Sequence, residues 1–151
     1  MSGLEKEMLG RLGLMENMFS RYNFYEAESV GPDRAVYRLD IRPESRNPYG
    51  MVHGGAMYTM ADDAAGAAAH SDGRYYVTQS GTLHFLRNQS RGVIRAEASV
   101  RHRGRTTCLV DVDITGEEGA LLATGEFTYF CVAAEKQSRE DVPPPLPGTT
   151  D

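Results

Sequence analysis

The chain has no tryptophan, only two cysteines and no apolar run long enough to span a membrane. Cys108 and Cys131 show neither metal-ligand nor redox spacing, and both lie in strand-like segments, so we expect two reduced, buried thiols. The N-terminus lacks the basic region and apolar core of a secretory signal. These absences together predict a cytoplasmic protein with no membrane anchor and no disulfide.

Basic residues are fewer than acidic ones, 16 against 21. The net charge of −5 argues against a general nucleic-acid binder. His84 and His102 have no ligand-spaced partners, so we expect no metal site. With 151 residues, of which 40% are hydrophobic, the chain is long enough for one domain with a real core.

Helical and disordered segments are expected at the two ends. Apolar residues recur at helical spacing over residues 3–19, which predicts an amphipathic helix that packs on the fold. From Val142 the chain holds four prolines, and we expect a disordered tail over 134–151. The domain is therefore predicted to cover residues 1–133.

Most of the rest alternates between apolar and polar residues, as half-buried strands do. Short connections rich in glycine separate these segments, which favours an antiparallel meander. Combined with one long helix, this predicts an α+β fold. The expected strands are 24–30, 35–41, 75–86, 94–100, 108–114 and 121–131, the last with Leu121, Ala123, Gly125, Phe127, Tyr129 and Cys131 on one face.

The most informative segment is residues 53–70, a helix made mostly of alanine and methionine with Asp62 and Asp63 in its middle. A carboxylate in so apolar a helix is costly unless it is paired or has a function. His53-Gly54-Gly55 places free backbone N–H groups where the helix begins, which is a ready anion site. An acid together with an oxyanion-type pocket suggests acyl-transfer chemistry.

A longer motif supports this hypothesis and makes it more specific. Asn47, then His53-Gly54-Gly55 and Asp62 nine residues after the histidine, resembles the pattern of the PaaI-like family of hotdog-fold acyl-CoA thioesterases. The resemblance covers roughly residues 10–133 and implies a hotdog fold, in which a curved antiparallel sheet wraps a long central helix. It also implies a role for each site residue. The Gly54 N–H polarises the thioester carbonyl, and Asp62 is the nucleophile or general base. Asn47 positions the carbonyl or the water, Thr78 holds that water, and His53 orients the loop.

Helix geometry adds a constraint that the motif does not state. Gly54 and Asp62 are eight positions apart, which is about 12 Å along a helix. Because nucleophile and oxyanion donor must both reach one carbonyl group, a single helix cannot supply both. We therefore predict a homodimer in which Asp62 of one subunit works with Gly54 of the other. The resemblance suggests that dimers join into a homotetramer.

Two further sets of residues are candidates for binding the substrate. Residues 87–105 contain six arginines and one acid, a net charge of +5, which is either a solvated sheet edge or an anion site for the phosphates of coenzyme A. In relatives a turn here lies near coenzyme A, which points to Arg103, Gly104 and Arg105. For an aromatic or medium-chain acyl group the candidates are Gly55, Met57, Tyr58, Met60 and Phe85.

The sequence thus predicts an acyl-CoA thioesterase that needs no metal or redox cofactor, with coenzyme A as part of the substrate. The alternative is a hotdog protein that binds acyl-CoA without hydrolysing it; a hotdog dehydratase is a distant third option. Each site residue also has a structural interpretation: Asp62 as a capping carboxylate, the glycines as an entry turn, His53 as a structural hydrogen-bonding residue, and Thr78 as a strand threonine. For Asp63 we favour a hydrogen-bonding acid at an interface.

Overall fold

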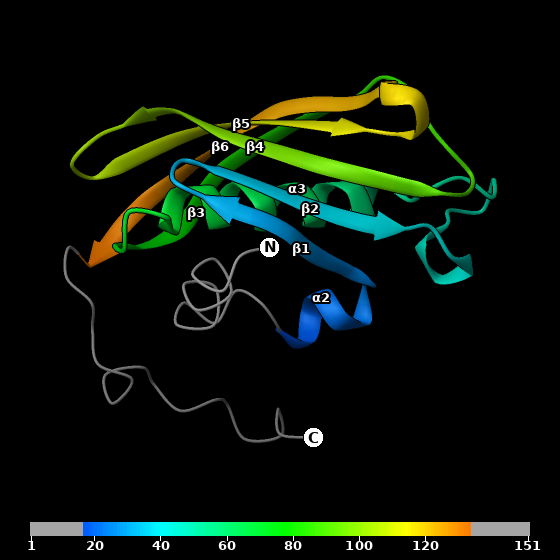
Figure 1. The fold of residues 1–151 in the computed structure, drawn as a ribbon, viewed down its shortest axis with the longest axis horizontal. Coiled ribbons are helices and arrows are strands. Elements are labelled where there is room, and N and C mark those ends of the chain that lie inside the picture. Colours follow the sequence, from blue (N-terminus) through cyan, green and yellow to red (C-terminus); the bar gives the residue numbers. More distant parts are fainter. Residues whose placement is uncertain (1–16, 134–151) are drawn as a thin grey trace.

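The computed structural model describes residues 17–133, and Figure 1 shows one long helix lying across a single sheet. The predicted helix over 3–19 lies mostly outside these residues, and the predicted tail over 134–151 lies wholly outside them. The elements in chain order are α2 (Met18–Tyr22), β1 (Tyr25–Gly31), β2 (Arg34–Asp40), the 3-10 turn η1 (Pro43–Ser45), α3 (Gly54–His70), β3 (Tyr75–Phe85), β4 (Val93–Arg103), β5 (Thr107–Thr115), the 3-10 turn η2 (Glu117–Gly119) and β6 (Leu121–Ala133).

The six strands form one antiparallel sheet in the order β1-β2-β4-β5-β6-β3. The predicted meander is therefore wrong at β3, which pairs with β6 and not with its sequence neighbour β4. The cause is the long helix between β2 and β3, which crosses the sheet and delivers β3 to the far edge. As a result β3 is an edge strand, with β6 on one side and no partner on the other among the described strands.

The core lies between α3 and the sheet, and α3 contacts all six strands. Small side chains let the helix lie close to the sheet: a Cβ on Gly66 would be 3.6 Å from the Tyr129 ring. Strict alternation holds in β2 and β5, where every second residue is buried. It fails at the start of β6, where Leu121 is 39% exposed and Leu122 is buried, because a shift in the β5–β6 register falls there.

The ends of α3 follow the expected signals. His53 is the N-cap, and its Nδ1 accepts a hydrogen bond from the Gly55 N–H at 2.8 Å. At the other end Ser71 is the C-cap, and Gly73 takes a left-handed φ of +87°. No helix within residues 17–133 is long and apolar enough to cross a membrane.

Candidate active site

Asp62 lies in the middle of α3 with its side chain partly buried, and two hydroxyl groups hold it. The Thr78 Oγ1 donates to Asp62 Oδ1 at 2.9 Å. The Tyr129 hydroxyl lies 2.7 Å from the same oxygen and 2.7 Å from the main-chain oxygen of Asp62. The structure thus brings Thr78 to Asp62 as a direct partner.

Sheet register explains why these two hydroxyls converge. Thr78 in β3 and Tyr129 in β6 are directly opposite each other in the antiparallel pairing. Opposite residues project from the same face of a sheet, here the face that α3 covers. Tyr129 was not among the predicted site residues. Its position in an alternating strand gave no sign that it reaches a helix 67 residues earlier in the chain.

Gly54 is the first residue of α3, and its backbone N–H is the one donor of the first turn that His53 does not bind. The N–H groups of Gly55, Ala56 and Met57 all bond to His53, through its ring or its carbonyl oxygen. Within residues 17–133 the Gly54 N–H has no such partner. A Cβ on Gly54 would lie 3.5 Å from the ring of Phe85, so Gly54 lies beside an aromatic side chain of β3.

Asn47 and His53 shape the loop that leads into α3. Asn47 Oδ1 accepts hydrogen bonds from the N–H groups of Tyr49 and Met51 at 2.9 and 3.1 Å. These two hydrogen bonds fix the orientation of the Asn47 amide. Its NH2 group has no partner among the described residues and is free to donate. His53 donates its N–H to the Ser45 oxygen at 2.7 Å, and its ring Nδ1 is the cap acceptor. The ring is therefore engaged in the loop itself.

Asp63 faces a different set of partners from its neighbour. The Tyr25 hydroxyl donates to Asp63 Oδ2 at 2.5 Å. Burial raises the pKa of Asp63, as does the adjacent Asp62, while hydrogen bonds from Tyr25 and Asn17 oppose the rise. Asp63 thus finds its hydrogen bond within the chain.

Of the residues proposed for the acyl group, only some reach the surface. Met57 and Met60 are 1% and 0% exposed and belong to the core. Tyr58 and Phe85 are 38% and 52% exposed. The Tyr58 hydroxyl lies 3.3 Å from the Gly81 oxygen, to which it donates, and its ring packs on Phe127.

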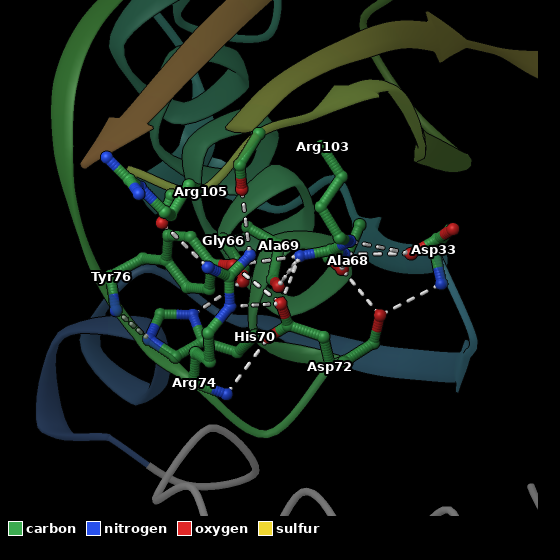
Figure 2. Close-up of polar contacts among 12 residues, drawn as sticks. Asp33, Gly66, Ala68, Ala69, His70, Asp72, Arg74, Tyr76, Arg103 and Arg105 are labelled. Carbon is green, nitrogen blue, oxygen red and sulfur yellow. Dashed lines mark hydrogen bonds and ion pairs between the residues drawn. The ribbon is translucent and has the colours of Figure 1, made fainter. Parts of the chain in front are cut away.

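Arg103 lies at the opposite end of α3 from Gly54, and its guanidinium is occupied (Figure 2). It donates to the carbonyl oxygens of Ala69 and Ala68 at 2.8 and 3.2 Å. It also forms ion pairs of 2.8 Å with both Asp33 and Asp72. A cation at a helix C-terminus stabilises the exposed carbonyl groups, so these contacts give Arg103 a structural role.

Ion pairs also neutralise other arginines of the basic stretch. Arg95 pairs with Glu28, and Arg101 pairs with Asp111 and Glu126. Among the described residues Arg105 keeps an exposed side chain without an ion pair, as do Arg87 and Arg91. The turn itself is fixed by Arg74, which donates to the main-chain oxygens of Arg105 and Gly104 at 2.8 and 3.0 Å.

Comparisons with known proteins place the chain in a family. A model of the thioesterase superfamily matches residues 49–123. The Mycobacterium tuberculosis protein Rv1847 is 34% identical over 64% of this chain and 74% of its own length. The acyl-coenzyme A thioesterase PaaI of Escherichia coli is 31% identical over 59% of this chain and 64% of its own length. A hypothetical thioesterase protein of Streptococcus pneumoniae, solved with coenzyme A, has a TM-score of 0.69 and 32% identity over 74% of this chain and 90% of its own.

The chain therefore belongs to the thioesterase superfamily, and its sheet and long helix form the hotdog fold. Within that superfamily it is a PaaI-like acyl-CoA thioesterase, a thioester hydrolase. The predicted family, fold and class of activity are confirmed. In residues 17–133 no three His, Cys, Asp or Glu side chains are grouped so as to hold a metal ion.

Proposed function

We propose that this thioesterase uses Asp62 as nucleophile or general base and the Gly54 N–H as oxyanion donor. One observation carries the proposal: α3 presents a carboxylate oriented by Thr78 and Tyr129 together with a backbone N–H left without a partner among the described residues. A carboxylate and a preorganised donor are the two groups that acyl transfer requires.

The chemistry can follow either of two courses. As general base, Asp62 takes a proton from water while the water oxygen attacks the thioester carbon. The Gly54 N–H stabilises the resulting oxyanion, the C–S bond breaks, and the coenzyme A sulfur receives the proton. As nucleophile, Asp62 forms a mixed anhydride as the thiolate leaves, and water then hydrolyses the anhydride. Neither course uses a metal or redox cofactor.

We propose further that the site is completed across a homodimer. Gly54 and Asp62 are eight residues apart on α3, about 12 Å along its axis, which is too far for one carbonyl group. Both halves border the edge strand β3: Thr78 lies beside Asp62 and Phe85 beside Gly54.

Two β3 edges that pair antiparallel about a point near Gly81 bring the Thr78 end of one copy beside the Phe85 end of the other. The outer edge of β3 has no neighbouring strand among the described ones, and such an edge is a template for pairing with another strand. Each Asp62 then faces the partner's oxyanion donor. Assembly of dimers into a homotetramer stays a prediction.

For the substrate we propose an aromatic or medium-chain acyl group that lies against Tyr58 and Phe85, the two partly exposed aromatic residues of this region. We exclude Met57 and Met60 from the residues proposed to contact the acyl group, because both are buried in the core. For the phosphates of coenzyme A we retain Arg105 and the Gly104 turn, and not Arg103, whose guanidinium already holds α3. The Streptococcus pneumoniae relative binds coenzyme A.

The test is a matched pair of isosteric variants, Asp62→Asn and Asp63→Asn, assayed for thiol release from aromatic and aliphatic acyl-CoAs. We expect Asp62→Asn to lose about 10³-fold or more of kcat, since it removes the attacking or proton-accepting oxygen. Asp63→Asn keeps an acceptor for Tyr25 and should retain most of the activity. Near wild-type turnover by Asp62→Asn would overturn the proposal.

A further inference from the structure

We propose that Tyr129 is a positioning residue that, together with Thr78, holds Oδ1 of Asp62 and leaves Oδ2 as the reacting oxygen. This inference rests on the proposed role of Asp62. Its basis is an asymmetry between the two carboxylate oxygens. Oδ1 lies within hydrogen-bond distance of both hydroxyls, at 2.9 Å from Thr78 and 2.7 Å from Tyr129. Among the described residues Oδ2 has no donor.

The Tyr129 hydroxyl also fixes the direction of the carboxylate. It lies 2.7 Å from Oδ1 and 2.7 Å from the main-chain oxygen of the same residue, so it bridges the side chain and backbone of Asp62. A single proton serves one acceptor at a time, and the main-chain oxygen alone would satisfy the hydroxyl. The contact with Oδ1 therefore exceeds what burial of a tyrosine requires.

Packing holds the Tyr129 ring in place. The side chain is 2% exposed, and Gly66, one turn after Asp62, admits the ring to the surface of α3. Tyr129 is flanked in the sheet by Cys108 on β5 and Thr78 on β3. A positioning group has to be rigid, and an aromatic ring set between two strands and a helix meets that condition.

The charges around Asp62 make the hydroxyl donors important. Asp63 is adjacent on α3, and the Tyr25 hydroxyl on β1 is bound to Asp63. Within residues 17–133 no Lys, Arg or His forms an ion pair with Asp62. Within these residues the side-chain hydrogen bonds of Asp62 come from the Thr78 and Tyr129 hydroxyls. Burial and the charge of Asp62 raise the pKa of Tyr129, so this tyrosine remains a proton donor throughout the working pH range.

The test is the pH profile of kcat/KM for Tyr129→Phe, which removes one oxygen atom and keeps the ring. We expect the acid limb to move to higher pH by about one unit, because the ionised carboxylate loses a donor. We expect kcat on the plateau to fall about ten- to a hundredfold, because Oδ2 is less well aimed. A wild-type acid limb and plateau would overturn the inference.

The matched control is Tyr25→Phe, which removes a buried hydroxyl from the neighbouring carboxylate. Without its donor Asp63 is protonated more readily, which lessens repulsion of the Asp62 charge. The acid limb should then stay in place or move to lower pH, the opposite direction from Tyr129→Phe. An equal upward shift in both variants would mean a general loss of structure and would reject a specific role.

A second variant keeps the inference testable if Tyr129→Phe fails to fold. Thr78→Val removes the other donor to Oδ1 and should also move the acid limb upward; an unchanged limb would contradict the assignment of Oδ1. Asp62→Asn separates the two proposals. If Asp62→Asn is active, the proposed function fails. If it is inactive while Tyr129→Phe and Thr78→Val behave as wild type, only the inference on positioning fails.

Discussion

The two ends of α3 are built in opposite ways. At the C-terminal end the carbonyl oxygens of Gly66, Ala68 and Ala69 all accept hydrogen bonds from side chains (Figure 2). The Ala68 oxygen accepts from Ser71 and Arg103, the Ala69 oxygen from Arg103, and the Gly66 oxygen from the His70 ring. At the N-terminal end His53 satisfies three N–H groups, and the Gly54 N–H alone is left without a partner among the described residues.

This contrast separates stability from chemistry along one helix. An unsatisfied donor is costly when buried and useful when a substrate oxygen is to fill it. A saturated helix end offers nothing to a ligand, but it resists fraying. We therefore expect substitutions at the N-terminal end to change turnover with little effect on folding, and substitutions at the C-terminal end to do the reverse.

Among substitutions at the two ends of α3, the largest expected effect is that of Gly54→Pro. Proline is favoured at the first helical position, and His53, with φ −69° and ψ 134°, has the conformation that precedes proline. The substitution thus removes the N–H and should leave the melting temperature near that of the wild type. We expect kcat to fall about 10²–10³-fold, the usual cost of one oxyanion donor.

Gly54→Ala is the control, because it keeps the N–H and its Cβ would meet Phe85 at an ordinary 3.5 Å.

Mixing Gly54→Pro with Asp62→Ala tests the dimer: after subunit exchange about a quarter of wild-type activity should return, since the heterodimer holds one intact site. No recovery in confirmed heterodimers would place both groups in one subunit's site and end the cross-subunit proposal.

The next effect is at the other end, in Arg103→Met. This variant removes the cation that binds the Ala68 and Ala69 oxygens and one of the two arginines paired with Asp72, which keeps Arg74, and we expect a loss of about 1–3 kcal/mol in the free energy of unfolding. Arg101→Met, which removes an exposed pair with Asp111 and Glu126, should change stability little. Denaturant titration measures both. If Arg103→Met kept its stability and instead raised KM for acyl-CoA, Arg103 would contact coenzyme A and the contrast would fail.

Local signals in the sequence were enough to find α3 and its site end. His-Gly-Gly marks the start, Ser-Asp-Gly marks the stop, and the apolar run between them makes Asp62 conspicuous. These signals act within a few residues, which is the range over which capping and helical periodicity operate. Alternation likewise identified the buried faces of the strands around residues 35–41 and 108–114.

Features that depend on distant pairing could not be found in this way. The edge position of β3 depends on the path of α3 across the sheet, and Tyr129 meets Asp62 only because β6 lies beside β3. Arg103 illustrates a second limit. An arginine beside a glycine turn has the same local pattern whether it binds a phosphate or a helix end; its partners Asp33 and Asp72 are 70 and 31 residues away.

The smallest expected effect is a pH dependence of stability that originates at His70. Burial lowers the pKa of His70, whose Nδ1 contacts the Gly66 oxygen at 2.7 Å while its Nε2 accepts from the Tyr76 N–H. Below about pH 6.5 the unfolded chain binds a proton that the folded chain resists, so stability falls with pH and levels off once the folded pKa is passed.

We expect the melting temperature of the wild type to drop by a few degrees between pH 7.5 and pH 5.5, and the slope to flatten in His70→Gln, which has no proton to gain. Thermal melts across this range provide the measurement. Activity per folded molecule should be unaffected by this substitution. A slope that survived in His70→Gln would show that the C-terminal end of α3 does not titrate, whereas a parallel change in the acid limb of kcat/KM would mean that the two ends of the helix are coupled.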